Sequence, residues 1–334
     1  MLRDNIFGPE EQNRCVKRFY ENERLFQSRK GEIIGYKTGW PIFDKSLDGL
    51  QNGLWVVGGL SNVGKTMFLL NLLWKLRINN PDTLFLFFTI DDSFAKCQAR
   101  LGALISRLYI NIFGAPNKGN KTSCEQQKVE DKREKANSQL IDAFEKNLII
   151  RDSVDGKTLD YIKNESLELK ARHENIVVFL DNFHKVRVNK FSGNQKWIYL
   201  SEEIKSLSNL LDCPLITTAE LRKLNHNGRP ELDDIKDATD LVYDADCTLL
   251  LHNDYHSCKG ETEIKRTVIS FGVEYDFPII DVRVAKNKFS DFKSSLYYDF
   301  TPSTCTYQEC TEDRTSTYRA VMNAKDMKNK RKWG

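Results

Sequence analysis

Short apolar runs alternate along the chain with longer segments in which apolar residues recur every three or four positions. The runs are rich in β-branched and aromatic residues, and several are apolar throughout, as expected for strands buried on both faces of a parallel sheet. We predict strands at residues 54–57, 83–89, 148–151, 176–180, 215–218, 247–251, 279–285 and 295–300. We predict helices between them, at residues 65–76, 93–108, 138–146, 157–172 and 197–211. This order predicts an α/β domain with a mostly parallel central sheet flanked by helices.

The N-terminal segment differs from this alternating region. Residues 9–28 are predicted to form a helix that begins at Pro9 and carries a narrow apolar stripe of Val16, Phe19 and Phe26. The stripe is too small for a core helix, so we expect it to dock on the main domain or on a neighbouring subunit. Residues 1–30 therefore form an arm, and the domain is expected to extend over residues 31–310.

Two further segments have few apolar residues. Residues 115–136 almost lack large apolar side chains and are predicted to be a solvated loop or mobile insertion. Residues 311–334 are predicted to be a basic tail, in which residues 325–332 hold five lysines and arginines. This composition suits a solvated, frayed terminus as well as a phosphate-binding segment.

The composition restricts the class of protein. The 334 residues are 40% hydrophobic and 29% charged, with a net charge of +3, which is too small to indicate a nucleic-acid partner. No apolar run approaches the roughly 18 residues needed to cross a membrane, and the acidic start does not suit a secretory signal. We expect a soluble, cytoplasmic protein without a membrane partner. The cysteines are scattered and form no CxxC pair, so reduced thiols are favoured over a zinc site built from His256, Cys258, Cys305 and Cys310.

Residues 59–66, GLSNVGKT, match the phosphate-binding pattern G-x-x-x-x-G-K-[ST] between a predicted strand and a predicted helix. The glycines permit a tight turn whose backbone N–H groups face a phosphate, and the helix N-terminus adds partial positive charge. Lys65 is placed to neutralise the β- and γ-phosphate oxygens, and the Thr66 hydroxyl to reach Mg²⁺. The sequence thus predicts binding of ATP or a close relative with magnesium. The predicted nucleotide-binding residues are Gly59, Ser61, Asn62, Gly64, Lys65 and Thr66.

Carboxylates follow two other predicted strands. Asp181 follows the apolar run at residues 176–180, and we predict that it supports the metal through water. Asp91 and Asp92 follow another strand and are expected at the carboxyl edge of the sheet, where ligands of such sheets bind. We expect Asp91 to orient and deprotonate the attacking water, and Asp92 to cap the following helix.

Several ordered motifs surround the loop. They are GYKTGWPIFD at residues 35–44 with LDGLQNG at 47–53, FTIDDS at 88–93 with Arg100, FLDNF at 179–183, TAELR at 218–222, RPELDDI at 229–235 and VAKNK at 284–288. Together they resemble the C-terminal motor domain of DnaB-type replicative helicases, in the RecA-like P-loop superfamily. The resemblance covers about residues 31–310. It implies a RecA-like fold, ATP hydrolysis with Mg²⁺, and a homo-hexameric ring on single-stranded DNA with a loader or replication partner.

The resemblance assigns further roles. Glu220 stands where the family carries a glutamine that senses the γ-phosphate, and Lys286 and Lys288 stand where basic residues reach the neighbouring subunit's ATP. Asp91 replaces the catalytic glutamate, which moves a catalytic contact by about 1 Å. Lys288 replaces an arginine and loses its planar fork. These changes predict slow or specialised hydrolysis that depends on assembly.

Two basic loops follow strands of the predicted sheet. They are polar and contain glycine, which suits contact with a sugar–phosphate backbone without selection of bases. We therefore expect them to bind single-stranded DNA. The predicted DNA-binding residues are Lys185, Arg187, Lys190, Arg222, Lys223 and Arg229.

The leading hypothesis is an ATP-driven, ring-forming DNA helicase or translocase. A RecA-like ATPase that acts as an assembly switch in recombination or regulation, without unwinding DNA, is the first alternative. A P-loop kinase for a small molecule is the second; it explains Lys65 and Asp181 but gives no role to Lys286 and Lys288.

Overall fold

A 10-stranded sheet runs through the computed structural model, which describes residues 9–28, 33–114, 123–224, 228–237, 239–270 and 273–332. The strand order is β10-β9-β8-β6-β1-β5-β4-β2-β3, and β7 pairs with β8. The parallel strands are β1 (Gly53–Gly59), β2 (Leu84–Thr89), β3 (Leu148–Asp152), β4 (Ile176–Asp181), β5 (Pro214–Glu220) and β6 (Cys247–Asn253). The antiparallel strands are β7 (Lys265–Ser270), β8 (Val273–Asn287), β9 (Ser295–Thr301) and β10 (Thr306–Glu309).

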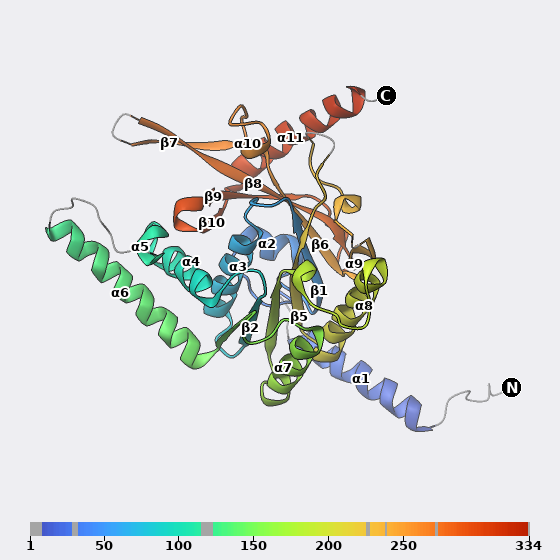
Figure 1. Cartoon of the computed structure of the whole chain (residues 1–334). Coiled ribbons are helices and arrows are strands. Elements are labelled where there is room, and N and C mark those ends of the chain that lie inside the picture. The colour runs from blue at the N-terminus through green and yellow to red at the C-terminus, as the bar shows by residue number, and fades with distance from the viewer. Residues whose placement is uncertain are drawn as a thin grey trace.

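Helices cover both faces of the sheet (Figure 1). One face carries α2 (Pro41–Leu47), α3 (Lys65–Asn79), α4 (Phe94–Ser106) and α6 (Ser123–Lys146). The other carries α7 (Leu159–Arg172), α8 (Gly193–Leu211) and α9 (Thr239–Asp244). Shorter elements are α5 (Asn111–Gly114), α10 (Asp254–Ser257), η1 (Phe183–Lys185), η2 (Leu232–Asp234) and η3 (Pro302–Thr304). The terminal helices are α1 (Pro9–Ser28) and α11 (Glu312–Lys332).

The central strands are buried on both faces, as their continuous apolar runs predict. Leu54 and Val56 of β1 belong to one core cluster, and Trp55 and Val57 belong to the other. Successive side chains of a strand point to opposite faces, so an uninterrupted apolar run fills two cores at once. Each predicted strand is present, and the α/β fold with a mostly parallel sheet is confirmed.

The prediction that residues 115–136 form a loop was wrong where the structure describes them, because α6 begins at Ser123. Residues 115–122 lie outside the described part of the chain. The helical part is rich in Glu, Gln, Lys and Arg, which favour helices without large apolar side chains. Its buried contacts are few and spaced at helical intervals, at Ala136, Leu140 and Ala143.

The C-terminal segment forms the helix α11, which is docked on the sheet up to Met322, so the prediction of a frayed tail was wrong for this part. Tyr318 and Met322 of α11 share a small core cluster with Ile279 and Tyr297 of the antiparallel strands. Arg314 anchors the start of the helix through a bidentate ion pair with the Asp299 carboxylate, at 2.8 and 2.9 Å.

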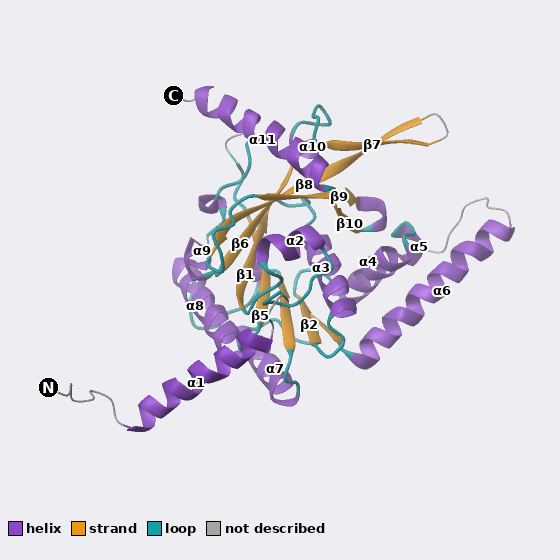
Figure 2. Cartoon of the chain, turned by 180° about the vertical axis from the view of Figure 1, so that it is seen from behind, coloured by secondary structure: helices purple, strands orange, loops and turns teal. Residues whose placement is uncertain are grey.

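The predicted N-terminal helix is present as α1, and it projects from the body of the molecule (Figure 2). The Val16 and Phe19 side chains are 52% and 60% exposed. These two side chains therefore do not dock on the domain of their own chain. The Phe26 side chain lies outside the described residues.

Candidate functional site

The phosphate-binding loop joins β1 to α3 at the carboxyl edge of the sheet. Gly64 has a φ of 106°, and a Cβ atom at this position would lie 2.4 Å from the Tyr307 hydroxyl. Only glycine adopts this φ without strain and leaves the Tyr307 side chain of β10 in place. Lys65 is the first residue of α3, so the open N–H groups of the helix face the loop.

Lys65 is folded onto its own loop. Its Nζ donates to the Gly59 and Leu60 carbonyl oxygens at 2.8 and 3.0 Å. Burial lowers the pKa of Lys65, and the nearby carboxylates of Asp181, Glu220 and Asp91 oppose this shift. The ammonium group is thus held by two carbonyl oxygens of the loop, in the electrostatic field of these carboxylates.

Asp181 ends β4 beside the loop. Its Oδ2 accepts a 2.6 Å hydrogen bond from the Thr66 hydroxyl, and its Oδ1 accepts one from the Thr218 hydroxyl of β5. Burial raises the pKa of Asp181, against these two hydrogen bonds and the charge of Lys65. The arrangement gathers oxygen atoms of the kind that Mg²⁺ accepts as ligands.

Asp91 and Asp92 occupy different environments after β2. The Asp91 side chain is half-exposed, and Lys185 Nζ lies 3.4 Å from its Oδ1. Asp92 forms ion pairs with Arg100 and with Lys96 of α4.

The prediction that Asp92 caps α4 was wrong. Asp152 Oδ2 accepts a 2.9 Å hydrogen bond from the Phe94 backbone N–H instead. The register pairs Thr89 of β2 with Asp152 of β3, so the neighbouring strand supplies the capping carboxylate.

Glu220 ends β5 and is paired in register with Gly59, where the loop begins. Asn182 Nδ2 donates a 3.1 Å hydrogen bond to Glu220 Oε1. Asn182 and Thr218 had no predicted role. Both lie at the carboxyl end of a strand next to a predicted site residue, and that position was the available signal.

Lys286 and Lys288 lie at the opposite edge of the sheet. β8 runs antiparallel to β6 and pairs Lys286 with Thr248, whereas Gly59 of the loop pairs with Leu251 further along β6. At about 3.3 Å per residue, Lys286 is displaced by about 10 Å from the loop along the strand direction, and Lys288 lies further still. The structure therefore separates these lysines from the loop of their own subunit.

Both lysines contact the start of β6 and the preceding helix. Lys286 Nζ donates to the Val242 and Tyr243 carbonyl oxygens at the end of α9, at 2.6 and 2.7 Å. Lys288 Nζ lies 3.6 Å from Asp246 Oδ1. These contacts hold the two side chains against the amino edge of the sheet.

The predicted DNA-binding residues fall into two groups. Five are exposed on loops near the carboxyl edge: Lys185, Arg187, Lys190, Arg222 and Lys223. Residues 225–227 of the second loop lie outside the described part of the chain. The sixth residue, Arg229, has a largely buried side chain.

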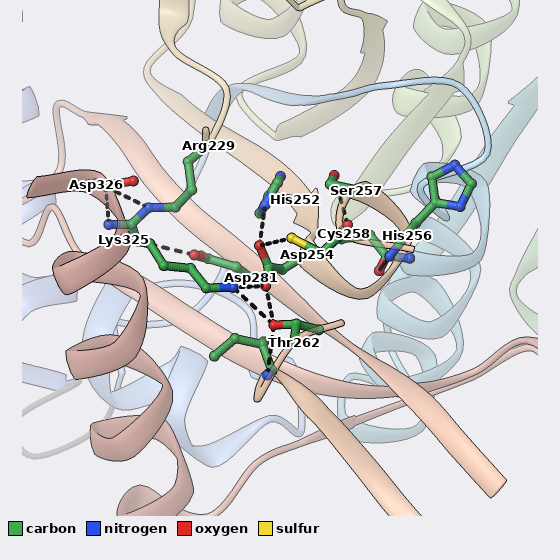
Figure 3. A network of polar contacts seen from close by, with 12 residues as sticks. Arg229, His252, Asp254, His256, Ser257, Cys258, Thr262, Asp281, Lys325 and Asp326 are labelled. Carbon is green, nitrogen blue, oxygen red and sulfur yellow. Dashed lines mark hydrogen bonds and ion pairs between the residues drawn. The ribbon is translucent and has the colours of Figure 1, made fainter. Parts of the chain in front are cut away.

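Arg229 belongs to an internal charge network (Figure 3). Its guanidinium lies 3.2 Å from Asp281 Oδ2 of β8 and 2.6 Å from Asp326 Oδ2 of α11, and the side chain is 9% exposed. Beside it, Lys325 of α11 binds Asp254. These partners leave Arg229 no free face for a phosphate group, so it is not retained as a DNA contact.

The strand, loop, helix and neighbouring carboxylate define a P-loop nucleotide-binding domain with a parallel sheet. The family model of the DnaB-like helicase C terminal domain matches residues 35–295, and the chain belongs to this family. Family membership favours the motor hypothesis over the switch and the kinase.

Similar proteins support this placement. The chain is 24% identical over 256 residues to replicative DNA helicase DnaC of Bacillus subtilis (strain 168), covering 75% of this chain and 54% of that protein. It is 25% identical over 236 residues to replicative DNA helicase DnaB of Helicobacter pylori (strain J99), covering 68% and 46%. The chain thus spans about half the length of the curated relatives it matches.

Two solved structures share the fold at 18% identity. One is an ATPase domain, which has a TM-score of 0.75 and covers 90% of this chain and 98% of its own. The other is a DnaB-like replicative helicase, described with its interactions with primase, which has a TM-score of 0.72 and covers 87% and 66%. The predicted RecA-like core is confirmed. None of the described helices carries an apolar stretch long enough to cross a bilayer.

Proposed function

We propose that this protein is an ATP-dependent, ring-forming DNA helicase or translocase motor that acts on single-stranded DNA. One observation carries the proposal: Thr66, Asp181 and Glu220 converge at one edge of the sheet, and the two basic residues of the strand-end motif lie at the other. A single subunit then carries the nucleotide-binding residues at one edge of the sheet. At the other edge it carries the basic residues that would complete the site of another subunit. Such a division is expected of subunits that assemble head to tail.

ATP and Mg²⁺ are the proposed ligands, and the residues present fit them. The backbone of Gly59, Ser61, Asn62 and Gly64 would cradle the phosphates, and Lys65 would exchange its carbonyl partners for phosphate oxygens. Thr66 and Asp181 would hold the metal. Bound Mg²⁺ would neutralise charge that develops on the transferred phosphoryl group.

Asp91 is the proposed base. It is half-exposed next to Lys185, and it is close enough to affect the pKa of Lys65. In this role it would orient the attacking water and accept its proton. Glu220, held by Asn182, would face the γ-phosphate and respond to its presence.

Lys286 and Lys288 are proposed to act on the nucleotide of the neighbouring subunit. Their distance from the loop of their own subunit supports this role, because they have no nucleotide to serve in cis. The exposed stripe of Val16 and Phe19 on α1 would pack on an adjacent motor domain. Contacts of this kind close into a ring when the rotation between subunits permits, and we propose a homo-hexamer.

Single-stranded DNA is proposed to bind the exposed basic loops. Phosphate contacts by lysine and arginine give affinity that does not depend on base sequence and that falls with salt. The proposed contacts are Lys185, Arg187, Lys190, Arg222 and Lys223. A loader or another replication protein is a further proposed partner.

Strand displacement tests the proposal. A forked DNA duplex with single-stranded tails is mixed with the protein, Mg²⁺ and ATP, and release of the labelled strand is followed. We expect displacement that requires ATP and that Lys65→Ala abolishes. Nucleotide-dependent assembly without displacement would favour the assembly switch and contradict the motor.

A further inference from the structure

After β5 the chain leaves the sheet at Leu221 and returns to it at Lys236, and residues 225–227 of this segment lie outside the described part of the chain. The two ends of the segment lie side by side at a contact that we call the neck. Leu221 and Ile235 form an antiparallel bridge at this neck. The Lys236 N–H donates to the Glu220 carbonyl at 2.9 Å, and the Arg222 N–H donates to the Asp234 carbonyl at 2.8 Å. The segment carries Arg222 and Lys223, so its neck connects the proposed γ-phosphate sensor to proposed DNA contacts.

The His184 imidazole bonds both sides of this neck. Its Nδ1 accepts a 3.3 Å hydrogen bond from the Glu220 N–H, and its Nε2 lies 2.7 Å from the Lys236 carbonyl oxygen. A carbonyl oxygen only accepts, so Nε2 must carry the proton while Nδ1 stays bare. The neutral Nε2–H tautomer is the one form of the ring that makes both bonds.

His184 is also fixed to the nucleotide side of the sheet. It lies in η1, three residues after Asp181, and its backbone N–H donates to Asn182 Oδ1 at 2.9 Å. Asn182 in turn binds the Glu220 carboxylate, so the end of β4 holds both the side chain and the backbone of Glu220.

Packing and burial keep the ring in place. The imidazole lies against Phe183 and Trp197, with ring centroids 5.5 and 5.3 Å away. Burial lowers the pKa of His184, which favours the neutral form required by the two hydrogen bonds. The charged groups that act on the pKa of His184 are Glu220 and Asp237, which raise it, and Lys236, which lowers it.

We infer that His184 is a positioning residue that couples the nucleotide site to residues 221–224 and 228–236 through the neck at Glu220 and Lys236, which rests on the proposed function. The imidazole touches neither nucleotide nor DNA in this role. A displacement of Glu220 or of the end of β4 moves the ring, and the ring transmits it to Lys236. Apart from the ring, the backbone hydrogen bonds of the neck join the end of β5 to the returning segment.

Three variants test the coupling. His184→Phe keeps an aromatic ring against Phe183 and Trp197 but removes both polar atoms. His184→Gln is the conservative variant, because its amide offers one acceptor and one donor. His173→Phe is the matched control, since His173 is an exposed histidine at the C-terminal end of α7.

The first readout is amide hydrogen exchange of residues 221–236, measured on the full chain with and without Mg²⁺ and a non-hydrolysable ATP analogue. We expect the analogue to change the protection of this segment in the wild type and in His173→Phe. His184→Phe should still bind the analogue, yet lose the change, and His184→Gln should recover most of it. A change that persists in His184→Phe, or that is absent from the wild type, overturns the inference.

The second readout is the ratio of ATP hydrolysis rates with and without single-stranded DNA. We expect His184→Phe to lower this ratio by about fivefold or more, which corresponds to a coupling free energy of about 1 kcal/mol. If wild-type hydrolysis ignores DNA while the analogue still changes exchange in a His184-dependent way, the proposed function fails and the coupling stands. If His184→Phe does not melt cooperatively, His184→Asn replaces it in the exchange experiment, because its shorter amide cannot span both contacts. A retained exchange response in His184→Asn contradicts the coupling, and a lost response supports it.

Discussion

The Thr66 hydroxyl donates a 2.6 Å hydrogen bond to Asp181 Oδ2, which joins the start of α3, just after the phosphate-binding loop, to the end of β4, two strands away from β1 in the sheet. Thr218 binds the other oxygen of the same carboxylate. Burial raises the pKa of Asp181, so the charged carboxylate is costly in the protein without nucleotide. It becomes favourable only beside cations, which is the environment that ATP and Mg²⁺ would provide.

Asp181→Asn should therefore separate stability from function. A folded-state pKa above the unfolded value means that the native state binds the extra proton, so ionised Asp181 costs stability as pH rises through that window. Removing the charge should raise the melting temperature of the nucleotide-free protein at neutral pH, by about 2 °C or more. Binding of Mg²⁺–ATP and hydrolysis should be lost. Thermal unfolding and nucleotide binding measure the two effects.

The control for this variant is Asp142→Asn, a half-exposed carboxylate that pairs with Arg77 and Lys146 away from the loop. It should leave nucleotide binding unchanged. A lower melting temperature for Asp181→Asn, together with intact Mg²⁺-dependent binding, would contradict the role given to Asp181.

Mixed subunits test whether Lys286 and Lys288 act in trans. Lys65→Ala keeps the two lysines, and the double variant Lys286→Ala/Lys288→Ala keeps the loop; each alone should be inactive. Equal mixing should recover about a quarter of wild-type hydrolysis, because random assembly places an intact loop opposite intact lysines at that fraction of interfaces. No recovery on mixing, with both variants folded by thermal unfolding, would contradict action across an interface.

Arg229→Ala should damage stability and leave DNA contacts unaffected. It removes the partner of the buried Asp281 carboxylate, and loss of one member of a buried ion pair costs about 3–5 kcal/mol. Denaturant unfolding measures this loss. Lys223→Ala is the comparison: its stability should change by less than about 0.5 kcal/mol, while DNA binding weakens and the slope of its salt dependence falls by about one. A stable Arg229→Ala protein with weakened DNA binding would restore Arg229 as a DNA contact.

Acid should weaken the contacts of His184. Burial lowers the pKa of His184 in the folded state below its unfolded value near 6.5. Between these two pKa values the unfolded state binds more protons than the folded state, so the free energy of unfolding rises with pH. This contribution is complete above about pH 6.5 and is lost as pH falls through the window. The melting temperature of the wild type should fall more on acidification than that of His184→Phe. Parallel pH profiles for the two proteins would show that the imidazole does not titrate in this way.

Local patterns predicted the fold well, and long-range partners explain what they missed. The apolar strands and the loop at residues 59–66 were predictable because each is specified within a short window of sequence. Arg229 looked like a surface residue because its partners Asp281 and Asp326 lie 52 and 97 residues away. Asp92 was taken as the cap of α4 because Asp152 reaches Phe94 only through strand pairing.

The same limit applies to α6 and to His184. The described part of α6 buries few apolar side chains, and two of them are alanines. The apolar periodicity of the sequence therefore gave little sign of a helix before Ser138. His184 gains its role from Glu220 and Lys236, whose backbone groups carry no signature in sequence. Site residues at strand ends were predictable, whereas contacts between separate loops required the structure.

The most direct test of the account is the rate of ATP hydrolysis with and without single-stranded DNA. Wild-type protein and Lys65→Ala are compared, with Lys45→Ala as a control, since Lys45 is an exposed lysine paired with Glu312. We predict slow hydrolysis that single-stranded DNA accelerates, loss of this activity in Lys65→Ala, and wild-type behaviour in Lys45→Ala. Hydrolysis that proceeds at the same rate with and without DNA would contradict a DNA motor.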